Sequence, residues 1–237
     1  MTAKNLVVLM MPLLGLVVLT ASSNEGDQKE LISYQVEEVK GKLVREDPTP
    51  EIKLQPGDSP TSGQLLRTGW RASAVISVPE AGAHFTLGSR TRVRLAADRP
   101  GVLLEVEKGR LRGLFDRLDG EPPRERTVVT PSAIMAVRGT EYGVAVSKSG
   151  DTNVIVFSGV VEVTDRRMQG TPVTVNKGEY CVIQRGQLPS QPMTHHMNRG
   201  SWDQGHMPSS MGGHGSGSSM GNHSSGHTSG GAMRHGG

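Results

Sequence analysis

Histidine and methionine side chains gather in the last fifth of the chain. Of the eight histidines, seven lie between residues 193 and 237, together with six methionines. Imidazole nitrogen suits copper, nickel and zinc, and thioether sulfur selects Cu(I). The residues predicted to bind metal are His195, His196, Met197, His206, Met207, His214, His223, His227 and His235. We expect copper, with nickel or zinc as alternatives. Their irregular spacing leaves open that this is a low-complexity segment whose histidines and methionines are incidental.

Catalytic chemistry has no comparable pattern in the sequence. The motifs HExxH and GxxxxGK[ST] are absent, and GxSxG occurs only at residues 217–221, inside the Gly/Ser-rich C-terminal segment that also holds many of the serines; the acidic residues are scattered. These motifs place a metal-bound water, a nucleophile or a phosphate next to its catalytic partner. We therefore predict that the protein is not an enzyme and has no resident organic cofactor.

Arginines alternate with other residues in two short segments. Arg90, Arg92 and Arg94 form one set, and Arg110 and Arg112 form another. In a strand, alternate side chains point to one face, so each set would line a surface. Such a basic face could bind an acidic polysaccharide or lipid head groups. The alternative is a solvated face on which these arginines pair with the acidic residues of segment 105–107.

A charged bend interrupts the apolar segment between Thr130 and Val146. Pro131 suits the entrance of a strand because it cannot donate a ladder hydrogen bond. Gly139 permits a bend, and Arg138 and Glu141 lie where they could pair across it. We interpret Arg138, Gly139 and Glu141 as a structural motif that fixes the backbone, with ligand binding as the alternative.

Composition limits the classes of partner. Aromatic residues are only 3% of the chain and the net charge is +3 without a long basic run, so nucleic-acid binding is not expected. Cys181 is the single cysteine, which rules out an internal disulfide. Its strand-like surroundings predict a small buried side chain, with a reactive thiol as the alternative.

Residues 31–190 are predicted to form an all-β domain. Residues 72, 74, 76 and 78 are apolar and alternate with mostly polar residues, as in a half-buried strand. Three segments place a glycine between two strand-like stretches, and Gly109, Gly159 and Gly178 are predicted to take positive φ there. Residues 113–126 are predicted to be an exposed loop. Short strands at this spacing predict a β-solenoid or roll, with a sandwich as the alternative.

The two ends of the chain have different compositions. Lys4 precedes an apolar run from Leu6 to Thr20, so residues 1–23 are predicted to be a signal peptide cleaved near Ala21 or Ser23. An uncleaved N-terminal anchor is the alternative. We expect export to the periplasm or the cell exterior, with no membrane span after cleavage. Residues 191–237 are rich in Gly and Ser and are predicted to be disordered.

The strand pattern carries a family resemblance. Thr130-Pro131-Ser132-Ala133, followed by Val137-Arg138-Gly139-Thr140-Glu141-Tyr142, resembles the core signature of FecR-domain proteins. Flanking agreement comes from Leu54 with Gly57-Asp58, from Thr68-Gly69 and Arg71-Ala72, from the glycine segments at 109 and 159, and from Val175 with Gly178-Glu179. The resemblance covers roughly residues 35–185.

This resemblance implies an exported, β-rich, solenoid-like domain. In iron-uptake signalling such domains sense an outer-membrane receptor and regulate a sigma factor. Only Met1 to Asn5 precede the apolar run here. We therefore expect a stand-alone exported member without the cytoplasmic anti-sigma region.

Three functional hypotheses follow from the sequence. The first is a non-enzymatic interaction or ligand-sensing module of the cell envelope, whose partner would be an envelope protein or an outer-membrane receptor. The second is a periplasmic protein that binds copper or nickel through its C-terminal segment. The third is a structural envelope protein that binds an anionic polysaccharide.

Overall fold

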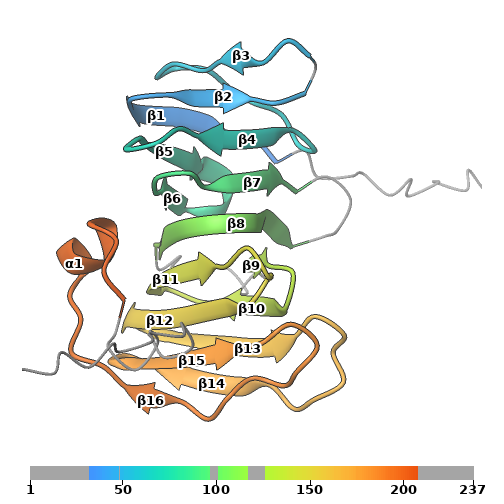
Figure 1. Ribbon diagram of the computed structural model, residues 1–237, viewed down its shortest axis with the longest axis vertical. Coiled ribbons are helices and arrows are strands. Elements are labelled where there is room, and N and C mark those ends of the chain that lie inside the picture. The colour runs from blue at the N-terminus through green and yellow to red at the C-terminus, as the bar shows by residue number, and fades with distance from the viewer. Residues whose placement is uncertain (1–31, 48, 97–100, 117–125, 208–237) are drawn as a thin grey trace, which may run out of the picture. The chain divides into compact units, whose positions relative to one another are not determined.

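The computed structural model describes residues 32–47, 49–96, 101–116 and 126–207 (Figure 1). The strands of these residues are β1 (Gln35–Lys40), β2 (Leu43–Arg45), β3 (Ile52–Lys53), β4 (Leu65–Thr68), β5 (Ser73–Val78), β6 (Ala83–Leu87), β7 (Arg92–Leu95), β8 (Val102–Phe115), β9 (Arg126–Val129), β10 (Ala133–Val137), β11 (Glu141–Val146), β12 (Thr152–Ser158), β13 (Val160–Asp165), β14 (Val173–Asn176), β15 (Glu179–Ile183) and β16 (Met193–Thr194). A 3-10 turn at Pro79–Ala81 and the short helix α1 (Arg199–Asp203) are the helical elements of the described residues. The all-β prediction is confirmed.

The strands form one hydrogen-bonded sheet that divides at β8. One half, which we call sheet A, has the order β1-β5-β6-β8-β11-β12-β15-β16. The other half, sheet B, has the order β3-β2-β4-β7-β8-β9-β10-β13-β14. Figure 1 shows the strands of both halves stacked one above another. The choice between a solenoid and a sandwich stays a prediction.

Strand β8 belongs to both sheets because Gly109 changes its direction. Residues before Gly109 pair with β7 and β9 in sheet B, and residues after it pair with β6 and β11 in sheet A. The φ of Gly109 is +100°, and a Cβ there would lie only 2.5 Å from the Cα of Thr91. Only glycine fits this corner. The predicted bend at Gly109 is confirmed, but it lies inside a continuous strand of 14 residues.

Gly159 and Gly178 make the same crossing in tighter turns. Gly159 (φ +79°) connects β12 of sheet A with β13 of sheet B, and Gly178 (φ +82°) connects β14 with β15.

The predicted loop at 113–126 differs from the structure at both ends. Phe115 is still in β8 and Arg126 starts β9, because both side chains are buried. The residues between 116 and 126 lie outside the described part of the chain.

Apolar side chains of both sheets meet in one core. The alternating residues of β5, Ala74, Ile76 and Val78, are buried there as predicted. Cys181 is also fully buried in this core, and burial raises the pKa of its thiol to about 12. The prediction of a small buried cysteine side chain is therefore confirmed. Within the described ranges, no helix is long and apolar enough to cross a membrane.

Candidate functional site

The outer face of sheet A is covered by the chain's own C-terminal segment. Residues 193–207, which we call the strap, begin with β16 paired to β15 and continue through helix α1. Trp202 of α1 is only 1% exposed. The prediction of disorder from residue 191 therefore differs from the structure over residues 191–207. The strap is polar in composition, but one large aromatic side chain provides the apolar burial that fixes it.

A glycine leaves room on sheet A for this tryptophan. Trp202 packs with Ala145, Ile155 and Tyr180 in a second apolar cluster outside the main core. A Cβ on residue 143 would lie 2.5 Å from Cε2 of Trp202, so Gly143 provides the space for the indole ring. Phe157 meets the same ring edge to face at 6.3 Å. This fit holds the strap against the outer face of sheet A.

Arginines of β8 hold the strap from the side. The Arg110 guanidinium lies 5.1 Å from the centroid of the Trp202 ring, and its Nη1 donates to the Trp202 carbonyl at 3.1 Å. Arg112 donates from Nε to Asp203 at 3.0 Å. Burial lowers the pKa of Arg110. Arg110 and Arg112 therefore contact residues of the strap, and they do not form the ion pairs with segment 105–107 that the alternative interpretation predicted.

Glu141 connects the strap to sheet A. Its carboxylate is 5% exposed and contacts Arg112 at 3.1 Å and Arg199 at 2.6 Å. The predicted Arg138–Glu141 pair is wrong. Glu141 points to the outer face with Gly143 because residues two apart share a strand face, whereas Arg138 is exposed in the preceding bend. Gly139 does make that bend, with a φ of +56°.

Hydroxyl groups fix the first residues of the signature segment, which runs from Thr130 to Tyr142. Thr130 Oγ1 accepts from the Ala133 N–H at 2.9 Å and lies 2.8 Å from the Thr152 hydroxyl. Ser132 donates to Thr152 Oγ1 at 2.7 Å. All three hydroxyl side chains are buried. Their network joins β10 to β12 across the two sheets, so this segment acts as a structural element.

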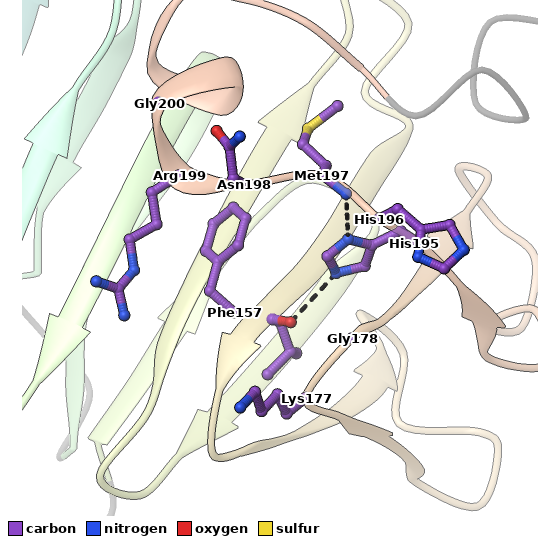
Figure 2. A pocket seen from close by; sticks show the side chains of 10 residues that line it. Phe157, Lys177, Gly178, His195, His196, Met197, Asn198, Arg199 and Gly200 are labelled. Atoms are coloured by element: carbon purple, nitrogen blue, oxygen red, sulfur yellow. Dashed lines mark hydrogen bonds between the residues drawn. The ribbon is translucent and has the colours of Figure 1, made fainter.

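A pocket of about 470 Å³ lies where the strap leaves sheet A. Figure 2 shows its lining, with Phe157 and Lys177 from the domain and residues 195–200 from the strap. His195 accepts a hydrogen bond at Nδ1 from the Met197 N–H at 3.1 Å, and its Nε2 donates to the Val156 carbonyl at 3.2 Å. Burial lowers the pKa of His195, which favours the neutral ring.

The predicted metal ligands are distributed unevenly in the structure. His195 uses both ring nitrogens in backbone hydrogen bonds, and His206 Nδ1 bonds the Ser201 carbonyl at 3.1 Å. Met197 and Met207 pack against the Trp202 cluster. Among the described residues no three His, Cys, Asp or Glu side chains are grouped to hold a metal. His214, His223, His227 and His235 lie outside the described residues, so metal binding by this segment stays a prediction.

The arginines predicted to line a basic strand face are neutralised on sheet B. Glu46 contacts Arg67 at 2.5 Å and Arg92 at 2.6 Å. Glu107 contacts both Arg92 and Arg94 at 3.1 Å. Burial alone would raise the pKa of Glu46, but the hydrogen bonds from Arg67 and Arg92 lower it below its ordinary value. This face is an ion-pair lattice, as the alternative interpretation of Arg92 and Arg94 predicted.

The sequence did not single out Trp202, Gly143 or Arg199. A tryptophan in a Gly/Ser-rich segment is the one signal that could have predicted docking, since large aromatic side chains seek burial. Gly143 lies in a β-branched strand, where a glycine often marks a close approach by another group.

Comparison with known proteins identifies the domain. The family model described as FecR protein matches residues 64–162. No curated protein matches the chain. Two crystal structures of a "putative anti-sigma factor" from Parabacteroides distasonis ATCC 8503, at 2.50 Å and 1.65 Å resolution, each match with 18% identity and a TM-score of 0.47. The matches cover 60% of this chain and 64% and 65% of those chains, respectively. The signature segment and the all-β fold agree with this match to the FecR protein family over residues 64–162.

Proposed function

We propose that this protein is a non-enzymatic FecR-domain module of the cell envelope that binds a protein partner on the outer face of sheet A. The family match supports a sensing or signalling role. The observation that carries the proposal is the close packing of Trp202 against Gly143, Ile155 and Phe157. It supports the proposal because a buried aromatic side chain in a fitted site is the arrangement expected of a hot spot for protein binding.

The strap is held in a way that permits exchange. Trp202 Nε1 is buried and has no hydrogen-bond partner among the described residues. Leaving an indole N–H unsatisfied costs about 1–3 kcal/mol, which offsets part of the gain from burying the ring. The Arg199 side chain is 60% exposed, so its pair with Glu141 adds little. A partner segment that satisfies the same contacts could therefore replace the strap.

The partner would be an outer-membrane receptor or another envelope protein. This choice follows from the role of FecR domains in sensing such receptors, and it requires export of the chain. Residues 1–23, the proposed signal peptide with cleavage near Ala21 or Ser23, lie outside the described residues. The proposal therefore includes a periplasmic or extracellular location.

Photo-crosslinking in cells that export the protein tests the proposal. A photoreactive residue at Lys177, which lines the pocket, is expected to capture an envelope protein. The same residue at Lys53, in edge strand β3, serves as the matched control. Capture from position 177 should increase when Trp202→Ala releases the strap. Equal capture from both positions, or none from 177 in either background, would contradict the proposal.

Copper binding by the C-terminal segment is the second candidate. His195, His196 and Met197 line one pocket, which places imidazole and thioether groups on consecutive residues (Figure 2). Because His195 and Met197 are engaged in the docked strap, we expect Cu(I) to bind best to a released strap. A Cu(I) competition titration should show stoichiometry lost on deletion of 193–237 and affinity raised by Trp202→Ala. Unchanged stoichiometry in the deleted chain would exclude this candidate, and nickel and zinc serve as comparison ions.

A further inference from the structure

One edge of the two sheets carries cations that the ion-pair lattice does not neutralise. The residues of this edge, which we call the cationic rim, are Arg71, Arg90, Lys108, Lys148 and Arg185. Each is exposed, and within the described ranges none has an ion-pair partner. This contrasts with Arg67, Arg92 and Arg94 on the face of sheet B, which all contact carboxylates.

The rim is continuous because each of its residues lies where a strand turns or ends at the same edge. The Arg71 N–H donates to Ser89 Oγ at 2.9 Å, and the Arg90 N–H donates to the Gly69 carbonyl at 3.0 Å. Lys108 is paired in register with Arg92, just after Arg90. These hydrogen bonds and pairings place Arg71 and Arg90 in neighbouring turns, before β5 and β7, and Lys108 beside them in β8.

The same edge continues into the second half of the domain. Gly109 is paired in register with Val146, which brings the turn containing Lys148 next to Lys108. The Arg185 N–H donates to Asp151 at the end of that turn at 2.9 Å. Neighbouring strands lie about 4.8 Å apart, so the rim from β5 to β15 spans roughly 24 Å. Asp151 is the acidic residue of this turn, and its other oxygen accepts from the Ser149 hydroxyl at 2.6 Å.

The backbone holds two of these arginines outward at a conformational cost. Arg71 and Arg90 have φ values of +52° and +55°, a region that side-chain-bearing residues seldom adopt. Glycine would be more stable at either position. Strained backbone of this kind is concentrated at functional sites, and here it presents two cations on adjacent turns.

An exposed aromatic ring completes the rim. Trp70 is 64% exposed, and the Arg71 guanidinium lies 4.3 Å from its ring centroid. One face of the indole is thus covered by a cation, while most of the side chain stays exposed. A flat ring beside a row of cations suits a sugar ring that carries a carboxylate, because the indole packs on the C–H face while arginine binds the anion.

We propose that the cationic rim, with Trp70, binds a linear acidic polysaccharide. The charge of the rim is complementary to regularly spaced carboxylates, and its length fits several sugar units. An acidic peptide would use the cations equally well but would gain less from the open indole face. The rim is separate from the strap, so this binding is independent of the partner site on sheet A.

Titration calorimetry of the full mature chain with an oligogalacturonate tests the inference at low and high salt. The decisive variant is Arg71→Gly with Arg90→Gly, because glycine removes both cations and relieves the positive φ, which keeps the fold intact. We expect about tenfold weaker binding, from two exposed charge contacts. Met168→Gly is the matched control, since Met168 is exposed, carries no charge and has the same backbone conformation (φ +54°).

Three further comparisons identify the ligand class. Trp70→Ala should weaken oligogalacturonate binding about fivefold through lost ring packing and leave polyglutamate binding unchanged. A methyl-esterified oligogalacturonate should bind weakly, and Trp202→Ala should have no effect on any of these affinities. The inference is overturned if the wild-type chain does not bind, if Met168→Gly weakens binding as much as the double variant, or if polyglutamate or anionic lipid vesicles bind more tightly than oligogalacturonate.

Discussion

The outer faces of the two sheets differ in how their side chains are covered or neutralised. Sheet A presents Gly143, Ala145 and Ile155, a small apolar surface that the strap covers with Trp202. Sheet B presents arginines and glutamates that neutralise one another, such as Glu46 with Arg67 and Arg92. The first face depends on a separate segment of the chain, whereas the second is complete within its own strands.

This difference determines which face is available to partners. An apolar surface must be covered by some segment, because leaving it in water costs about 25 cal/mol per Å². The strap is one such segment, and another could replace it. A lattice of partly exposed ion pairs contributes only about 0–1 kcal/mol per pair and leaves no unsatisfied group to attract a ligand. Binding to the face of sheet A is therefore expected to be the more sensitive to mutation.

Replacing Trp202 should produce the largest effect. Trp202→Ala removes the anchor of the strap and should destabilise docking by about 3 kcal/mol, at the lower end for a large aromatic side chain because the strap can leave the sheet. Amide hydrogen exchange should rise in β16 and α1 while the strands of the main core stay protected. Trp70→Phe, at an exposed site, is the control and should change neither. Unchanged protection of α1 in Trp202→Ala would show that other contacts hold the strap.

The docking of Trp202 can also be blocked by a change in the sheet. Gly143→Ala places a Cβ about where Trp202 lies, 2.5 Å from Cε2, so the indole must move. We expect about 2 kcal/mol of lost docking from this overpacking. With Trp70→Phe in the background, Trp202 fluorescence should shift to the red as the ring meets water. Gly200→Ala in the strap is the matched control, because its new Cβ would make only an ordinary contact at 3.5 Å. A red shift in the control alone would contradict this account.

The sequence predicts the domain well because local patterns determine it. Alternation at residues 72–78 and glycines at 109, 159 and 178 depend only on neighbouring residues, and the structure confirms them. The continuous strand at Gly109 was not predictable in the same way. Whether a glycine there closes a turn or redirects a strand depends on Thr91, which approaches it from a distant part of the chain.

Pairing of charges was predicted less well because a strand offers each charge several partners. Glu141 could reach Arg138 along the chain, but period two turns it toward Arg112 of β8 and Arg199 of the strap. The strap itself escaped prediction for a related reason. Its order depends on one tryptophan and on the room left by Gly143, 59 residues earlier, and composition alone does not predict such a contact.

The ion-pair lattice of sheet B should give the smallest effect, and one that depends on pH. Arg67 and Arg92 lower the pKa of Glu46 in the folded protein, so its charge stabilises the fold above the ordinary pKa of about 4.5 and this contribution is lost as the pH falls through the lowered value. Glu46→Gln should therefore cost about 1 kcal/mol at pH 7, because the pairs are partly exposed. Urea unfolding should show this difference shrinking below pH 4.5. Glu38→Gln, whose partner Lys40 is largely exposed, is the control and should have little effect at either pH. A cost for Glu46→Gln that stays constant with pH would mean that Glu46 acts through packing and not through its charge. The ion pairs of sheet B would then not be what distinguishes its outer face from the apolar face of sheet A.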